Sequence, residues 1–157
     1  MRYSPSLVPN TTPSDEFLMA NRKASGQRIF LQCAVLSGFI CIALGAFGAH
    51  ALKASLSLDA MAIWQTAVQY QMFQTLALLG VALLMGGSSA QTSRQGLLKI
   101  TGYLFILGIA LFCGSLYLLA LTGVRWLGAI TPLGGASFLA GWALLFWHSM
   151  RATSVSD

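Results

Sequence analysis

The sequence has very little charge. Asp, Glu, Lys and Arg make up 8% of its 157 residues, and hydrophobic residues make up 56%. Soluble domains carry about 25% charged residues. A soluble fold needs a polar shell, which this composition does not supply, whereas lipid hydrocarbon suits so much apolar surface. The chain is therefore predicted to be an integral membrane protein.

Acidic residues are especially scarce. The chain has four, Asp15, Glu16, Asp59 and Asp157, and all lie outside the apolar runs or at their edges. Proton- and cation-coupled transport commonly uses carboxylates within the membrane. Acid/base catalysis usually needs a carboxylate or a well-placed histidine. We therefore expect no enzyme activity and assign no catalytic residue.

Candidate metal ligands are few and scattered. Cys33, Cys41 and Cys113 lie singly inside apolar runs, and none belongs to a CxxC or Cys/His pattern. Buried single cysteines typically act as small hydrophobic residues. His50 and His148 are expected at opposite membrane faces, so they cannot share one metal ion. We expect no metal site and no cofactor.

Basic residues outnumber acidic ones by nine to four, which gives a formal net charge of +5. A basic balance is also typical of nucleic-acid-binding proteins. Here, however, the positive residues flank apolar runs singly and form no stripe with aromatic residues. This pattern is typical of membrane-spanning segments. The expected partner is the lipid bilayer, and nucleic acid is not expected.

Four apolar runs are long enough to cross a bilayer. They cover residues 29–49, 60–85, 97–121 and 130–147. The first is too long for a signal peptide, whose apolar core is usually about 7–15 residues. Short connections between the runs predict an all-α, up-down-up-down bundle over residues 29–149. Ser57 or Asp59 is predicted to start the second helix.

The flanking segments predict the topology. Residues 1–28 contain three prolines and several polar residues, so we expect a mostly disordered cytoplasmic tail. Residues 150–157 form a second, short cytoplasmic tail. Six basic residues next to the apolar runs lie on the side of the termini: Arg22, Lys23, Arg28, Arg94, Lys99 and Arg151. The opposite loops contain only Lys53 and Arg125. The positive-inside rule therefore places both termini in the cytoplasm.

Polar and glycine-rich segments gather in the outer half of the predicted bundle. The candidate residues there are His50, Tyr70, Gln71, Gln74, Tyr117, Thr131, Pro132, Gly134 and Gly135. Because unpaired polar groups in lipid cost several kcal/mol, hydrogen bonding between helices is one explanation. A hydrated pocket for a polar ligand is the other. Gln65 and Gln69 are four apart and share a helix face.

Small residues recur at four-residue spacing in three of the runs. They are Ser37, Cys41, Gly45 and Ala49 in the first, Ala110 and Gly114 in the third, and Ser137 and Gly141 in the fourth. Such faces let membrane helices approach closely. They predict packing within the bundle, with self-association as the alternative.

The chain resembles the YgdD-like family of small inner-membrane proteins, which is related to a eukaryotic four-span family. The resemblance covers residues 29–148 and rests on GAFGAHAL, WQTAxxYQMFQTLALL, GSLYLLAL and TPLGGxSFLAGW. It implies a four-span fold in the bacterial inner (plasma) membrane and no known reaction. Gln74 stands where the family usually has a histidine, which weakens any role for a histidine pair with His50.

These features favour a non-catalytic helper, scaffold or small regulatory subunit. Its protein partner would be another membrane protein or a second copy of the chain. The first alternative is a channel or carrier for a small polar solute, with its site in the outer half of the bundle. The second alternative is a membrane enzyme or a haem-binding subunit, for which His50 is the only candidate at that face.

Overall fold

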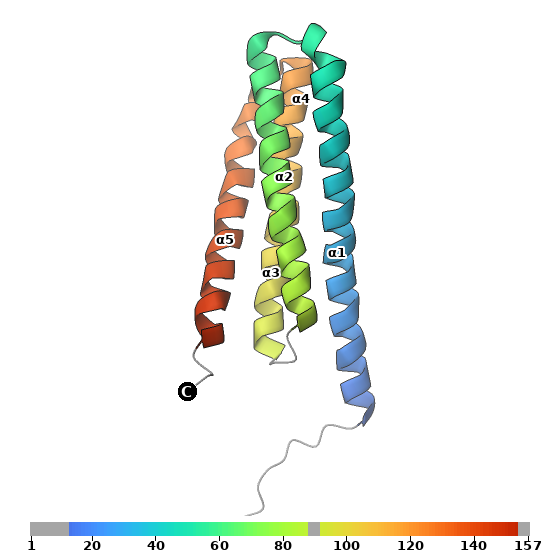
Figure 1. The fold of residues 1–157 in the computed structure, drawn as a ribbon. Coiled ribbons are helices and arrows are strands. Elements are labelled where there is room, and N and C mark those ends of the chain that lie inside the picture. The colour runs from blue at the N-terminus through green and yellow to red at the C-terminus, as the bar shows by residue number, and fades with distance from the viewer. Residues whose placement is uncertain (1–12, 88–91, 154–157) are drawn as a thin grey trace, which may run out of the picture.

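The chain folds into long helices arranged side by side (Figure 1). The computed structural model describes residues 13–87 and 92–153, and all its regular elements there are helical. The elements are α1 (Pro13–His50), η1 (Leu52–Ala54), α2 (Leu58–Gly87), α3 (Thr92–Gly108), η2 (Ile109–Cys113), α4 (Gly114–Thr122), η3 (Arg125–Ala129) and α5 (Thr131–Thr153).

Four helical segments within the described residues are long and apolar enough to cross a membrane. They are Ser25–Ala54, Leu58–Gly87, Gln95–Thr122 and Arg125–Met150. Figure 1 shows them running alternately up and down, which confirms the predicted bundle. We call the end that holds η1 and η3 the loop end. The opposite end, where α1 begins and α5 finishes, is the termini end.

The structure corrects the predicted boundaries of the two tails. The disordered tail was expected to reach residue 28, but α1 begins at Pro13. Proline is favoured in the first turn of a helix, and Asp15 and Glu16 complement the helix dipole there. Extending an existing helix is also much easier than starting one. Likewise α5 continues to Thr153, past the predicted boundary at residue 150. Residues 1–12 and 154–157 of the predicted tails lie outside the described residues.

Local sequence signals set the helix ends near the loop end. The Ser57 hydroxyl accepts a hydrogen bond from the backbone N–H of Ala60 at 3.2 Å, so Ser57 caps α2 as predicted. Gly123 has a φ of 69° and ends α4, with its N–H bonded to the carbonyl of Leu119. Pro132 lies in the first turn of α5, also as predicted.

The third membrane segment is not one continuous α-helix. The π-helix η2 separates α3 from α4 in its middle. Gly134 of α5 lies against this wide turn, because a Cβ on Gly134 would lie 2.8 Å from the Phe112 Cα. The apolar sequence of this segment did not predict η2.

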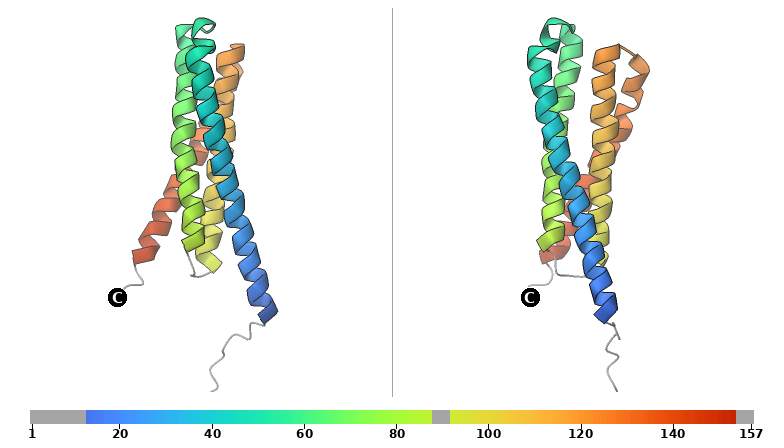
Figure 2. Two further views of the ribbon diagram at one scale, coloured as in Figure 1. Left: turned by 45° about the vertical axis from the view of Figure 1, so that its right-hand side comes forward. Right: turned by 90° about the vertical axis from the view of Figure 1, so that its right-hand side faces the viewer.

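α2 is the central helix of the bundle. It packs against α1 along most of its length and also against α3, η2 and α4, whereas α5 packs mainly against α3 and η2. Toward the termini end, α1 extends past the other helices (Figure 2), while Gln27 and Phe30 of α1 still lie against Gly86 of α2 and Gly102 of α3. The largest fully buried apolar side chains are Phe30, Phe105, Leu78, Met85, Leu98 and Val81.

The outer surface of the bundle is apolar, which is what lipid contact requires. Ile42, Leu139 and Phe39 are each more than 70% exposed. In water such a surface would drive aggregation, whereas in a bilayer it faces hydrocarbon of equal polarity.

Candidate functional site

The outer-half polar cluster predicted from the sequence contains a hydrogen-bonded network across three helices. The Gln71 side chain on α2 donates from Nε2 to the Ser37 carbonyl of α1 at 3.1 Å. Its Oε1 accepts from the Tyr117 hydroxyl of α4 at 2.8 Å. Ser37 Oγ in turn lies 2.7 Å from Thr75 Oγ1 of α2. One amide thus links α1, α2 and α4.

Burial makes this network important for the fold. Gln71 is only 4% exposed, so its amide has little access to water or lipid. A buried amide without partners costs several kcal/mol, and here both its donor and acceptor ends are paired. The alternation of helix direction places these residues at similar depth, which is why separate segments of sequence meet. Gln71 and Tyr117 are therefore brought together as the sequence suggested.

Gln74 belongs to a second connection. Its Oε1 accepts a hydrogen bond from the Trp142 indole N–H of α5 at 3.1 Å. Trp142 also packs edge-on against Phe105 of α3, with ring centroids 5.7 Å apart. Gln74 thus joins α2 to α5. Since His50 lies at the far end of α1, it is not part of this connection.

Two further bonds tie the last helix to its neighbours. Ser115 Oγ of α4 lies 2.9 Å from Thr131 Oγ1 at the start of α5 and also donates to the Phe112 carbonyl. Ser137 of α5 donates to the Leu104 carbonyl of α3 at 2.9 Å. Each bond satisfies a buried hydroxyl between helices.

The remaining candidate residues are spread over the bundle. His50 is exposed at the end of α1, and Pro132 is exposed on α5. Tyr70 is 44% exposed and stacks on Phe112, with ring centroids 4.6 Å apart. Gly134 and Gly135 pack against Phe112 from α5. Of the nine candidates, the structure therefore joins only Gln71 and Tyr117 by a hydrogen bond between side chains and places the others at separate positions in the bundle.

Three of the four small residues predicted on α1 contact α2, whereas Ala49 is exposed. Ser37 bonds to Thr75, and Cys41 Sγ lies 3.4 Å from the Val68 carbonyl of α2. A Cβ on Gly45 would lie 3.5 Å from Val68 Cγ1. The face formed by Ser37, Cys41 and Gly45 thus lets α1 and α2 approach closely.

The small residues of the last two membrane segments behave differently from each other. Ser137 and Gly141 of α5 pack on α3, where a Cβ on Gly141 would lie 3.1 Å from the Phe105 ring. Ala110 is exposed, and a Cβ on Gly114 would meet nothing within 4 Å. The predicted packing role of this second pair is therefore corrected. Ala110 lies in η2, where the wider π-turn no longer places residues four apart on one face.

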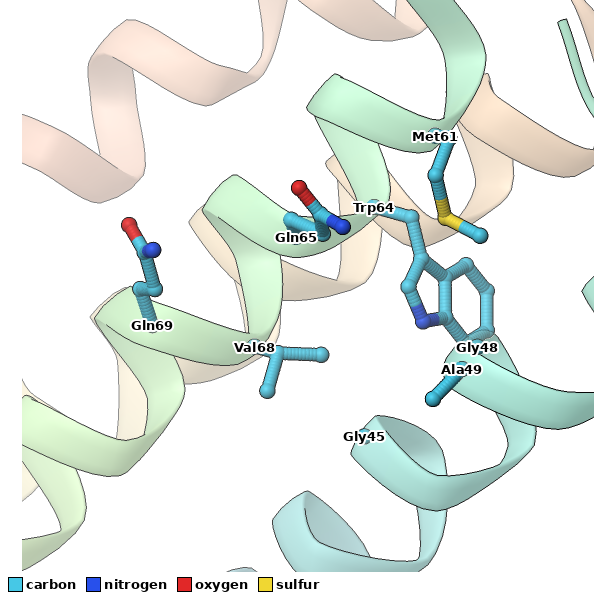
Figure 3. A pocket seen from close by; sticks show the side chains of 8 residues that line it. All are labelled: Gly45, Gly48, Ala49, Met61, Trp64, Gln65, Val68 and Gln69. Atoms are coloured by element: carbon cyan, nitrogen blue, oxygen red, sulfur yellow. The ribbon is translucent and has the colours of Figure 1, made fainter. Parts of the chain in front are cut away.

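A shallow groove lies between α1 and α2 at the loop end (Figure 3). Its volume is about 240 Å³. Three small residues from α1 and five residues from α2 line it: Gly45, Gly48, Ala49, Met61, Trp64, Gln65, Val68 and Gln69. Of the predicted small-residue set, Gly45 and Ala49 lie here.

Sequence reasoning missed the role of two tryptophans. Trp64 donates from Nε1 to the Leu44 carbonyl of α1 at 3.1 Å and is 2% exposed. Trp142 donates to Gln74. Neither tryptophan was assigned a hydrogen bond from the sequence. An indole N–H in a membrane-spanning segment needs an acceptor, and this requirement could have paired Trp142 with a nearby amide.

Among the residues that the structure describes, no three of His, Cys, Asp and Glu lie close enough to hold a metal ion. Cys33, Cys41 and Cys113 are all unpaired thiols, and Cys41 and Cys113 are buried. These thiols lie in helices next to apolar side chains.

Comparison with known sequences gives consistent matches. The sequence profile of a family described as "Protein of unknown function (DUF423)" matches residues 44–135. A UPF0382 inner membrane protein, YgdD of Escherichia coli, is 45% identical over 125 residues, covering 79% of this chain and 91% of the relative. A UPF0382 membrane protein of Staphylococcus haemolyticus is 42% identical over 124 residues, covering 79% and 97%.

No solved structure matches the chain. The relatives are named as membrane and inner membrane proteins, in agreement with the four apolar helices. The chain therefore belongs to the UPF0382 (DUF423) family of multi-pass inner-membrane proteins, whose function is unknown.

Proposed function

We propose that this protein is a non-catalytic membrane component: a helper, scaffold or small regulatory subunit of a membrane assembly. The network centred on Gln71 carries the proposal. Its amide is 4% exposed and bonds to Ser37 and Tyr117 on two neighbouring helices. A side chain that recognises a substrate must present a hydrogen-bonding group to it, whereas these groups bond to each other.

The other polar contacts support the same conclusion. Gln74 accepts from Trp142, Ser115 pairs with Thr131, and Ser137 bonds to the Leu104 carbonyl. Every bond joins two membrane segments. Such bonds each stabilise a membrane bundle by roughly 0.6 kcal/mol on average. A bundle held together by such bonds suits a protein that acts by contact with other proteins.

Two experiments test the proposal. First, membranes from a strain lacking the gene are compared with wild type by native gel and quantitative mass spectrometry. We expect one membrane complex to fall in abundance and to recover when the gene is restored. Finding every membrane complex at its wild-type abundance in the strain lacking the gene would contradict the proposal.

The second experiment measures solute flux in liposomes that contain the purified protein. We expect no flux above that of empty vesicles. The matched pair of variants is Gln71→Leu, which removes the buried amide, and Gln32→Leu, which removes an exposed amide on α1. Flux of a polar solute that Gln71→Leu abolishes and Gln32→Leu preserves would overturn the proposal in favour of a carrier.

A further inference from the structure

Two glutamines of α2 face away from the bundle. Gln65 and Gln69 are exposed, whereas Gln71 and Gln74 on the same helix are buried. Figure 3 shows Gln65 and Gln69 one turn apart along α2, at the edge of the groove with α1. The hydrogen bonds inside the bundle therefore account for the buried amides of α2. They do not account for the exposed amides of Gln65 and Gln69.

Gln69 lies deep in the membrane. α2 has 30 residues and is about 45 Å long, whereas the hydrocarbon core is about 30 Å thick. With the helix centred, Gln65 lies about 3 Å below the hydrocarbon surface and Gln69 about 9 Å below it. The Gln65 side chain can reach the membrane–water interface, whereas the Gln69 side chain lies too deep to do so. A polar group at that depth costs several kcal/mol unless another group pairs with it.

The rest of the same helix face is apolar. Met72, Leu76 and Leu83 continue the face toward the termini end and are 56%, 62% and 62% exposed. Their spacing of three, four and seven residues keeps them on one side of the helix together with Gln65 and Gln69. The face thus has two amides in one half and an apolar stripe in the other.

The edge of α1 beside this face is recessed. Gly45, Gly48 and Ala49 have no side chain beyond Cβ, and the groove of about 240 Å³ lies over them. Trp64 covers Gly48 from α2, since a Cβ there would lie 2.8 Å from its Cδ1. A second helix can therefore approach α2 closely on this side.

We propose that Gln65 and Gln69 form the centre of a homodimer interface, with the α2 face of one copy against that of the other. Both copies of a membrane protein have the same orientation, so a twofold axis must run along the membrane normal. This symmetry puts identical residues at equal depth. A glutamine amide both donates and accepts, so Gln69 of one copy pairs with Gln69 of the other, and Gln65 pairs likewise.

The self-complementary amides make a second copy the occupant that fits best. A different membrane protein would need its own amide or hydroxyl at the same depth, whereas a second copy supplies it by symmetry. The apolar residues Met72, Leu76 and Leu83 then pack below the amide pairs. This homodimer does not depend on the function proposed above.

The first test measures dimerisation in lipid. Copies labelled with donor and acceptor dyes are reconstituted over a range of protein-to-lipid ratios, and energy transfer gives the dimer fraction. We expect the Gln65→Leu/Gln69→Leu double variant to dimerise about tenfold more weakly than wild type, since two amide pairs are lost. The matched control is Gln32→Leu, an exposed amide on α1, which should leave the dimer unchanged.

The second test locates the interface by disulfide formation in native membranes. Gln69→Cys should give a covalent dimer on oxidation. Leu139→Cys on α5, which is 73% exposed, should remain monomeric, and wild type reports on the native thiols. Helix content by circular dichroism confirms that each variant is folded.

Three results would overturn the proposal. They are monomers at every protein-to-lipid ratio, equal crosslinking from Gln69→Cys and Leu139→Cys, and a Gln69→Cys adduct whose mass shows a different protein. The last result would identify the α2 face as the docking site of another membrane protein.

Discussion

Gln71 joins three helices through a single side chain. It donates to Ser37 of α1 and accepts from Tyr117 of α4. Since membrane helices gain no hydrophobic stabilisation from each other in lipid, such bonds and close packing hold the bundle together. At the scale of single residues, stability therefore depends on a few buried polar groups.

Removing the Tyr117 hydroxyl should weaken the bundle measurably. Tyr117→Phe deprives Gln71 Oε1 of its donor, so we expect a loss of about 1 kcal/mol in unfolding free energy. Reversible unfolding in mixed detergent measures it. Tyr103→Phe is the matched control because Tyr103 is 59% exposed. If both variants lose the same unfolding free energy, the Tyr117–Gln71 bond does not stabilise the bundle.

Gly134 is a second position where one residue decides the packing. Gly134→Ala would place a methyl group 2.8 Å from the Phe112 Cα, and backbone cannot move aside as a side chain can. We expect a loss of about 1–3 kcal/mol, measured by thermal unfolding. Gly114→Ala, in the neighbouring helix with nothing within 4 Å of its Cβ, should be neutral or slightly stabilising. Equal stability of the two variants would contradict this contact.

Among the elements, η2 stands out. Its five residues form a π-turn between α3 and α4, opposite Gly134 of α5. π-turns close hydrogen bonds between residues five apart, so each holds an extra residue relative to an α-turn. The helix surface is locally rotated here, which explains why Ala110 and Gly114 do not share a packing face.

A deletion experiment tests this reading of η2. Deleting Ala110 should convert the π-turn into an α-turn and leave the helices before and after it in register. Deleting Gly80 from α2 should instead rotate all later α2 residues by about 100° and turn Val81 and Met85 out of the core. We therefore expect the first protein to accumulate in membranes and the second to be degraded. If neither deletion protein accumulates, the π-turn η2 does not contain an extra residue that the fold can lose.

For the whole molecule, the structure places both ends of the described chain at one end of the bundle (Figure 1). The distribution of charge predicts which end faces the cytoplasm. Lys53 and Arg125 are the two basic residues near the loop end, and Arg22, Lys23, Arg28, Arg94, Lys99 and Arg151 lie in the parts of the helices nearest the termini end. The positive-inside rule therefore predicts that the loop end faces away from the cytoplasm.

Thiol labelling in intact cells checks this orientation. Ser55→Cys lies in the exposed connection after η1, so a membrane-impermeant maleimide should label it from outside. Wild-type protein gives the background from Cys33, Cys41 and Cys113. A fluorescent protein fused after Asp157 should fold and fluoresce, as it does in the cytoplasm. Labelling of Ser55→Cys only after cell lysis would show that the loop end faces the cytoplasm, opposite to the predicted topology.

Much of the fold could be predicted from the sequence, because the membrane requirement is strong and local. Apolar length sets the spans, Ser57 caps α2, and Pro132 marks the first turn of α5. The tail boundary at residue 28 was missed because a disordered segment and a helix of mixed polarity look alike when only composition is considered. The wide turn η2 was missed because its sequence, IALFC, is as apolar as any α-helix in lipid.

The candidate site was only partly predictable. Depth alone placed Gln71 and Tyr117 in the same half of the bundle, but the sequence did not separate a shared pocket from direct bonds between helices. Which side of α2 faces α1 or α4 depends on how all the helices pack together. Likewise, the spacing of Gln65 and Gln69 predicted a common face, and only the tertiary structure showed that this face is exposed.

By itself, the sequence determined four membrane helices and their alternating directions, since the free energy of an apolar segment in lipid depends on its own residues. The tertiary structure decided which polar groups are paired inside the bundle and which face lipid. That division depends on helix rotation, and rotation is set by side chains from several distant segments packing at once.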